Sequence, residues 1–266
     1  MLVFAFVLGC QKNSENHTSA GGEDNSLSKV LEAGYFQWGA DIIECRPFVY
    51  EDPEHPGTLI GFEMEIAQGI ARHMGVEQKL VKKAWDTLIP ELQKGSFDMA
   101  MNGIEDTEDR RKIVLFSEPY YVYSQQITVR RETTGISCLK DLIGKRVATL
   151  SGTAAEDILR SNPGIDIRLN PETIYSYRDL ESGKVDAVLL DKPLAMAYGN
   201  TSKLKNVGES FGEGAYVIAI RKEEKSLLKA VNEALRAMKE SGELGQILRK
   251  YGIMDKYQQK VGIRAI

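Results

Sequence analysis

Two short polar runs, each directly after an apolar stretch, are the residues of this chain best suited to hold a small ligand. Asn102 and Gly103 follow the run "FDMAM", and Asp191 ends the run "VDAVLLD". If both apolar runs are buried strands, these groups lie at the carboxyl ends of the strands, where open α/β sheets bind ligands. Asp191 also precedes Pro193, so its carboxylate could instead cap a helix that begins there. The two roles are compatible, because a carboxylate accepts several hydrogen bonds.

A dense group of charges follows the first polar run. The stretch "MAMNGIEDTEDRRK", residues 99–112, holds four acids and two arginines. Thr107 is placed to cap a helix, and Glu108 and Asp109 would lie in its first turn, where acids satisfy free N–H groups and the helix dipole. The spacing therefore predicts that a helix begins near Thr107, and it explains these three side chains without a ligand.

Other chemistry has little support in the sequence. His17, His55 and His73 lack metal-ligand spacing, and neither a nucleophile elbow nor a Walker loop occurs, so we expect no cofactor and no metal. A formal net charge of −4 without a basic run argues against nucleic acid as a partner. Cys45 and Cys138 could pair, but we expect both to be free and partly buried.

The segments that would position these groups alternate between strand and helix patterns. Strands are predicted at 35–41, 77–83, 97–101, 145–150, 166–169 and 185–191, and helices at 61–75, 84–95, 154–161, 174–183 and 192–199. The predicted buried faces are Phe62, Ile66, Ile70 and Met74 in one helix, and Trp85, Leu88, Ile89 and Leu92 in the next. This alternation predicts an α/β fold with largely parallel sheets.

A weak internal repeat concerns domain organisation. "LQKGSFDMAM" and "LESGKVDAVL" share a Leu, a Gly three residues later and an Asp three further on. Any helix, glycine turn and strand in succession could look alike in this way. The alternative is two lobes of similar construction, whose polar strand ends would face each other across a cleft.

The amino-terminal segment has the pattern of an export signal. "MLVFAFVLGC", residues 1–10, is apolar and too short to span a bilayer, but it has the length of a signal-peptide core. Its end resembles a bacterial lipobox, whose cysteine, here Cys10, is lipidated after cleavage. No Lys or Arg precedes the run, so a stray apolar start is the alternative. Residues 11–26 are polar and aperiodic, and we expect a flexible tether.

Nine pieces of the chain, in order, resemble the family 3 extracellular solute-binding proteins, the amino-acid receptors of ABC importers. They are "LSKVLEAGYFQWGAD", "PFVYED", "GFEMEIAQGIARHMG", "AWDTLIPELQKGSFDMAMNG", "TEDRR", "FSEPYY", "DLIGKRVATLSGTAAE", "LESGKVDAVLLDKP" and "MKESGELGQILRKYG". The resemblance implies a two-lobed α/β fold of the type II periplasmic-binding-protein kind, with a ligand cleft between lobes joined by two crossover segments. It places 27–121 and 216–266 in lobe 1 and 124–211 in lobe 2.

The resemblance also implies a ligand site. Arg110, at a T-x-x-R spacing, would hold the ligand's α-carboxylate in its guanidinium fork, and Asp191 would accept the α-ammonium. Gly103 would offer backbone groups where a side chain would block the ligand. Further residues that it places at the ligand are Asn102, Asp41 and Cys45 in lobe 1, and Ser151, Thr153 and Ala154, which match carboxylate-binding positions in lobe 2. Trp38 and Trp85 are expected in the core.

Two positions depart from the family pattern. Glu105 stands where most relatives carry Ser or Thr, and it could hold Arg110, turn away from the cleft or bind a cationic ligand. Cys45 stands where many relatives place an aromatic lid, which leaves the ligand type open. Together with Asp41, Glu44 and Asp191, Glu105 would give the cleft surplus negative charge. We therefore expect a basic or neutral polar amino acid to bind better than glutamate or aspartate.

The resulting hypothesis is a non-catalytic, lipid-anchored receptor in the periplasm or at the cell surface. It would capture a small amino acid, with polar or basic ones favoured, and deliver it to the permease of an ABC transporter. An enzyme is the alternative from another class, because exported prephenate or arogenate dehydratases share the fold and use a cleft acid, for which Glu105 is the candidate. A sensory module is a third possibility.

Overall fold

A computed structural model describes residues 24–43 and 45–264. The predicted signal peptide, the predicted lipidation site Cys10, most of the predicted tether and Glu44 lie outside these residues. In the described part of the chain, no helix combines the length and the apolar character that crossing a membrane requires.

The strands form two five-stranded sheets and a small two-stranded one. The first sheet has the order β4 (Glu77–Lys82), β1 (Tyr35–Ala40), β5 (Met99–Ala100), β12 (Ala219–Ile220), β6 (Leu115–Phe116). The second has the order β11 (Leu204–Tyr216), β7 (Tyr121–Arg130), β10 (Ala187–Asp191), β8 (Arg146–Leu150), β9 (Asp166–Asn170). β2 (Tyr50–Glu51) and β3 (Leu59–Ile60) pair with each other.

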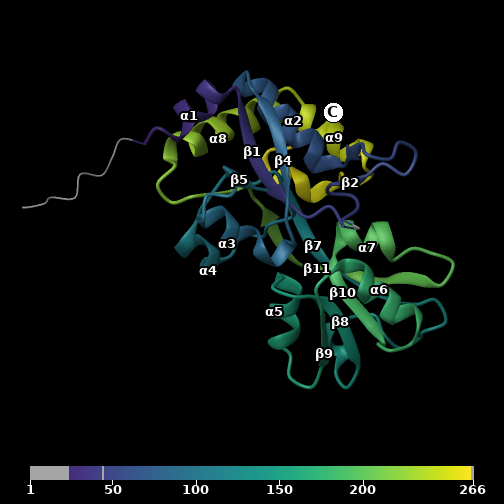
Figure 1. Ribbon diagram of the computed structural model, residues 1–266. Coiled ribbons are helices and arrows are strands. Elements are labelled where there is room, and N and C mark those ends of the chain that lie inside the picture. Colours follow the sequence, from purple (N-terminus) through teal and green to yellow (C-terminus); the bar gives the residue numbers. More distant parts are fainter. Residues whose placement is uncertain (1–23, 44, 265–266) are drawn as a thin grey trace, which may run out of the picture.

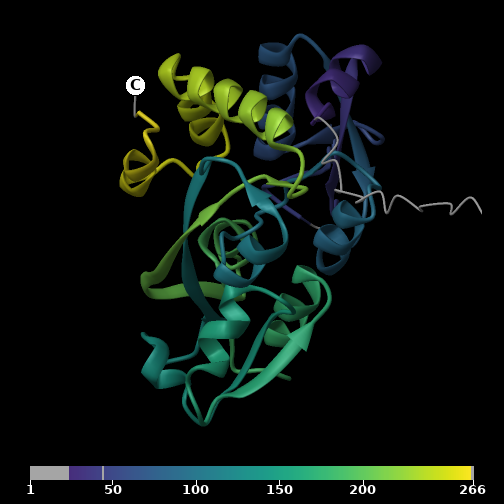
Figure 2. The ribbon, with the colours of Figure 1, turned by 90° about the vertical axis from the view of Figure 1, so that its left-hand side faces the viewer.

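Helices cover both large sheets and divide the molecule into two bodies. They are α1 (Ser26–Ala33), α2 (Phe62–Met74), α3 (Leu88–Gln93), α4 (Glu108–Ile113), α5 (Ala154–Arg160), α6 (Thr173–Glu181), α7 (Lys192–Tyr198), α8 (Lys225–Glu240) and α9 (Glu243–Lys250), with 3-10 turns at Trp85–Thr87, Leu139–Leu142 and Lys256–Val261. Figures 1 and 2 show α1, α2, α8 and α9 on the body of the first sheet and α5, α6 and α7 on that of the second. This is the predicted two-lobed α/β fold.

The chain passes between the two sheets twice. It leaves the first sheet after β6, enters the second at β7, and returns between β11 and β12. Figure 1 shows β7 and β11 running side by side from the junction into the second body. The two passages are tied together, because the Tyr120 N–H donates to the Tyr216 carbonyl over 3.1 Å. The cleft between the bodies therefore lies beside the β5, β10 and β11 ends.

The prediction of largely parallel sheets was correct only for part of each sheet. β1 is parallel to β4 and β5, and β8 is parallel to β9 and β10. β12 is antiparallel to β5 and β6, and β7 is antiparallel to β10 and β11. The antiparallel strands are those next to the two passages, because a chain that returns from one sheet to the other must reverse its direction.

Helix α2 shows how the sequence specifies its own elements. Phe62, Ile66 and Ile70 are fully buried at intervals of four, as predicted, and they pack in the core of the first body with Trp38. The helix ends at Gly75, whose φ of 70° lets its N–H reach back to the carbonyls of the last turn. The second body has its own core, which includes Ile127, Val147, Leu159 and Leu189.

Candidate ligand site between the two lobes

Residues from both bodies enclose a small cavity at the junction. Its lining consists of Cys45, Phe48, Trp85, Asn102, Gly103, Glu105, Leu150, Thr153, Thr173, Leu190, Asp191, Leu194 and Tyr216. The enclosed space is about 30 Å³, enough for about one or two water molecules. A solute the size of an amino acid therefore needs the two bodies to separate before it can enter.

Asn102 ties the ends of two neighbouring strands together. Its Oδ1 accepts the Asp41 N–H over 3.2 Å, and its Nδ2 donates to the Asp41 carbonyl over 3.4 Å. Its own carbonyl accepts the Trp85 indole N–H over 2.9 Å. Asn102 thus fixes where β1 and β5 end, while one side of it lines the cavity.

Asp41 and Cys45 lie close to this strand junction, but only Cys45 lines the cavity. The Asp41 carboxylate accepts the Ile43 N–H over 2.8 Å, and burial raises its pKa. The Cys45 Sγ lies 3.9 Å from Asn102 Oδ1. Burial raises the pKa of the Cys45 thiol, which keeps it neutral. Cys45 and Cys138 are both free, as expected, but only Cys45 is partly buried, and the prediction of partial burial is wrong for Cys138, which is exposed.

Gly103 is required by packing against a neighbouring ring, and its N–H, one of the two backbone groups expected to face a ligand, is bound within the protein. Its φ is 62°, and a Cβ added there would lie 2.7 Å from Phe48 Cε1. Its N–H donates to Glu63 Oε1 over 2.7 Å, so this N–H is not directed at a ligand. Glu63 is fully buried in the first turn of α2, and Tyr120 OH also donates to its Oε1. Burial raises the pKa of Glu63 to about 7.

Glu105 and Arg110 form a buried ion pair that reaches the other body. Arg110 Nη1 lies 2.5 Å from Glu105 Oε2, and Glu105 is 1% exposed. The other carboxylate oxygen, Oε1, accepts the Ala154 N–H over 2.9 Å, and Arg110 Nη2 donates to the Gly152 carbonyl over 2.9 Å. Of the interpretations considered for Glu105, pairing with Arg110 is the one present, and turning away from the cleft is wrong.

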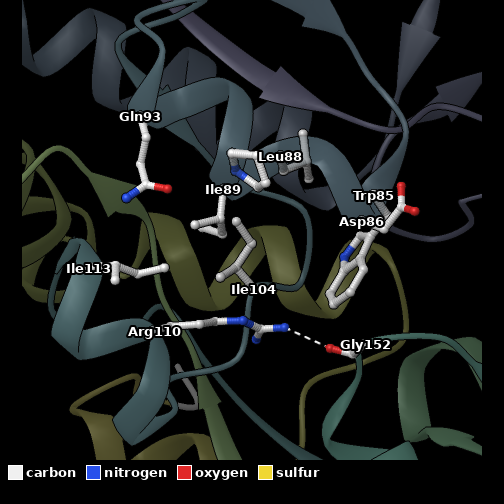
Figure 3. Close-up of a pocket in the computed structure, with 10 residues that line it drawn as sticks. Trp85, Asp86, Leu88, Ile89, Gln93, Ile104, Arg110, Ile113 and Gly152 are labelled. Carbon is white, nitrogen blue, oxygen red and sulfur yellow. Dashed lines mark hydrogen bonds between the residues drawn. The ribbon is translucent and has the colours of Figure 1, made fainter.

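Trp85 packs against the core only in part, because it also belongs to the junction. Its side chain is half-buried and lines the cleft cavity, and the Arg110 guanidinium carbon lies 5.3 Å from its ring centre. Trp85 also lines a second cavity of about 280 Å³, together with Ile89, Ile104 and Ile113 among others. Figure 3 shows the Arg110 guanidinium in this view, reaching toward Gly152 below the Trp85 ring. The predicted helix over 84–95 is a 3-10 turn followed by α3, which leaves Trp85 and Ile89 only half-buried.

Ser151 and Thr153 serve the local structure of the second body. The Thr153 hydroxyl donates to the Leu150 carbonyl over 2.8 Å and accepts the Glu156 N–H over 3.4 Å, as the cap of α5. The Ser151 N–H donates to the Asn170 carbonyl over 3.0 Å, and Ser151 does not line the cavity. Within the predicted group, Ala154 is the residue whose backbone contacts the other body.

Asp191 is a buried carboxylate that faces the cavity. Its Oδ1 accepts Gln125 Nε2 over 2.6 Å, and its Oδ2 accepts the Tyr216 hydroxyl. Burial, with Glu105 as the next contribution, raises its pKa to about 7. Asp191 occupies the cap position of α7, but its side chain forms no capping hydrogen bond. The interpretation of its carboxylate as a helix cap is therefore wrong.

Sequence reasoning missed several residues of the site. Tyr216, Phe48 and Trp85 supply aromatic walls, and Gln125 orients Asp191. Glu63 could have been found from the sequence, because it is an acid in the first turn of a helix whose apolar spacing predicts burial. Tyr216 and Gln125 carry no such signal, because only the pairing of β7 with β11 and β10 brings them to Asp191.

A two-lobed α/β fold with a polar cavity at the lobe junction is the architecture of a solute-binding protein. The family model of bacterial extracellular solute-binding proteins, family 3, matches residues 42–254, and the chain belongs to this family. Its relatives are amino-acid-binding proteins of ABC importers.

Individual relatives are similar over most of their length. The L-cystine-binding protein TcyJ of Escherichia coli (strain K12) is 34% identical over 233 residues, which cover 86% of each chain. The arginine-binding periplasmic protein of Mannheimia haemolytica is 31% identical, covering 79% of this chain and 90% of its own. A solved structure, the ancestral amino acid-binding protein AncCDT-1, a precursor of cyclohexadienyl dehydratase, has a TM-score of 0.79 at 31% identity, covering 85% of this chain and 99% of its own. These proteins are named for binding, which favours a receptor over the dehydratase alternative.

Proposed function

We propose that this protein captures a small amino acid, or an amine closely related to one, and delivers it to the permease of an ABC importer. A basic or neutral polar solute is preferred over an acidic one. The observation that carries this proposal is the charge of the cleft. Of the described residues that line the cavity, Glu105 and Asp191 are acidic and none is Lys, Arg or His; because Glu105 is paired with Arg110 beside the cavity, Asp191 is the acid of the lining that has no ion pair. In a closed and weakly screened site, this lining favours positive charge on the ligand.

In this proposal the site has a cation arm and an anion arm. Asp191 accepts the ligand's ammonium group, because its carboxylate has acceptor capacity beyond the bonds from Gln125 and Tyr216. Arg110 and the Ala154 N–H are the donors that converge on a carboxylate, at present that of Glu105. Asn102, Gly103 and Cys45 shape the wall between the arms.

The lobe boundaries are part of the same proposal. Lobe 1 consists of residues 27–121 and 216–266, and lobe 2 of residues 124–211. The change of sheet between β6 and β7 and between β11 and β12 supports these limits. Motion at the two passages would open the cavity to a solute and close it again, and the closed form would present its joined surface to the permease.

Calorimetric titration tests the ligand class. Arginine, lysine, glutamine, cystine and glutamate are titrated into the wild-type protein and into Asp191→Asn. The proposal expects glutamate to bind most weakly. Asp191→Asn should lose at least about tenfold in affinity, since a hydrogen bond to a charged group contributes about 1.5–3 kcal/mol. Asp166→Asn is the matched control, because Asp166 pairs with Arg168 on the edge strand β9, away from the cavity. A wild-type preference for glutamate would refute the charge argument.

The proposal also includes anchoring of the protein to a membrane by a lipid. We infer that Cys10 carries the lipid, on the strength of the "VLGC" ending of the apolar run. Expression of the full chain and of Cys10→Ser, followed by separation of membrane and soluble fractions, tests it. The variant should move to the soluble exported fraction. Identical partition of the two proteins would refute the lipidation of Cys10.

A further inference from the structure

The Glu105 carboxylate accepts hydrogen bonds from the donors of the anion arm. A group of the protein itself therefore occupies the place proposed for a ligand's carboxylate. One oxygen is bound by Arg110 Nη1 at 2.5 Å and the other by the Ala154 N–H at 2.9 Å. Arg110 Nη1 also donates to the Glu105 carbonyl over 2.9 Å. The guanidinium and the backbone N–H therefore already hold an anion, and that anion is attached to the chain.

The Glu105 carboxylate is held too firmly to be exchanged without cost. Its side chain is 1% exposed, and its backbone forms an isolated bridge with Tyr216. A ligand carboxylate that took its place on Arg110 would leave Glu105 buried without its cation. Removing one partner of a buried ion pair is strongly unfavourable, whereas the incoming carboxylate only replaces bonds that already exist. A solute that leaves Glu105 on Arg110 avoids this penalty.

Among the described residues, the rest of the lining offers a charged site for a cation and no positive charge for a second anion. Asp191 is the second carboxylate among the described lining residues. Phe48, Trp85 and Tyr216 add aromatic rings, with the Phe48 and Tyr216 ring centres 5.6 Å apart. Aromatic faces attract organic cations through their electron-rich surfaces. The cavity thus matches an ammonium or guanidinium group among aromatic walls.

We propose that Glu105 acts as a built-in substitute for the ligand's carboxylate, and that the preferred solute is a small organic amine without a carboxylate next to its ammonium group. This inference rests on the proposed function, because it assumes that the solute's cation binds at Asp191. It narrows the ligand class from amino acids to the amines that their decarboxylation would produce. Glu105 is then the residue that sets specificity, and Arg110 is a positioning residue that holds Glu105 in place.

Matched pairs of ligands test this inference directly. Each pair consists of an amino acid and the amine that lacks its α-carboxylate groups: arginine and agmatine, lysine and cadaverine, and cystine and cystamine, where two carboxylates are absent. Affinities are measured by calorimetric titration for the wild-type protein, Glu105→Thr and Glu105→Gln. Asp109→Thr is the control, because Asp109 lies on the same segment, is 92% exposed and pairs with Lys112. Circular dichroism of each variant verifies that it is folded.

The expected result is a wild-type preference of at least tenfold for the amine in the pair that binds. Glu105→Thr should lose that preference or reverse it, because Arg110 then becomes free to bind the ligand's carboxylate, and Asp109→Thr should retain it. A tenfold wild-type preference for the amino acid would overturn the inference and leave the proposed function standing. So would an unchanged ratio in both Glu105 variants. A wild-type protein that binds no member of any pair would also overturn the inference, and it would refute the proposed function as well if glutamine did not bind either.

Discussion

Replacing Arg110 by alanine should destabilise the folded protein by leaving Glu105 as a buried carboxylate without its cation. Breaking a buried ion pair costs about 3–5 kcal/mol. Glu105 is 1% exposed and the Arg110 side chain 17% exposed, so some water can replace the guanidinium and the lower end applies. We expect a loss of about 3 kcal/mol. For a chain of this size, the midpoint of thermal unfolding should then fall by roughly 6–12 °C.

The neighbouring arginine provides the matched control for this experiment. Arg111 pairs with Asp106 in the same segment, but its side chain is 63% exposed, and surface pairs contribute about 0–1 kcal/mol. Arg111→Ala should therefore change the midpoint by only a few degrees. The double variant Glu105→Thr with Arg110→Ala should regain much of the lost stability, because it removes both charges. An Arg110→Ala midpoint equal to that of Arg111→Ala would refute the reasoning.

Three further predictions follow from buried groups and backbone geometry. Burial raises the pKa of Asp191 to about 7, whereas an unfolded aspartate titrates near pH 3.9. The folded state therefore binds more protons between about pH 4 and 7, and the free energy of unfolding should fall as the pH rises through this window. Asp191→Asn should reduce that slope in urea titrations, and an unchanged slope would contradict the assignment. Gly103→Ala should lower the free energy of unfolding by about 1–3 kcal/mol more than Gly95→Ala does. Both glycines have positive φ, but only at position 103 would a Cβ lie against a ring. Equal losses in urea unfolding would show that the ring moves aside. A solute should change the tryptophan fluorescence through Trp85, which lines the cleft, and not through buried Trp38, so Trp85→Phe should abolish the change. Its persistence in Trp85→Phe would place the solute elsewhere.

Local elements were predictable because their signals are local. The four-residue spacing of Phe62, Ile66 and Ile70 and the following Gly75 specify α2 within one segment. Thr107 caps α4 by accepting the Arg110 N–H, as its place before two acids indicated. The run ending at Asp191 is a buried strand, so the predicted polar strand ends do meet at the junction. The resemblance to the family then implied the two lobes and six of the thirteen residues that line the cavity, which are Cys45, Asn102, Gly103, Glu105, Thr153 and Asp191.

The partners of the polar side chains were not predictable, because they come from distant parts of the chain. Gly103 is bound by Glu63, which lies 40 residues earlier in the sequence. Asp191 meets Tyr216 and Gln125 only because β10 and β11 both pair with β7. Sequence periodicity reports which face of a segment is buried, but not what covers that face.

The sequence by itself determined many of the elements, the family and the candidate acids and arginine, but it did not indicate the long strands β7 and β11. The tertiary structure alone decided what the arginine binds. Glu105 and Arg110 are five residues apart, yet their pair becomes a buried anion site only when the second lobe brings the Gly152 carbonyl and the Ala154 N–H to it. The physical reason is desolvation: a carboxylate with an exposed position stays in water, whereas one enclosed by both lobes must find its donors within the protein.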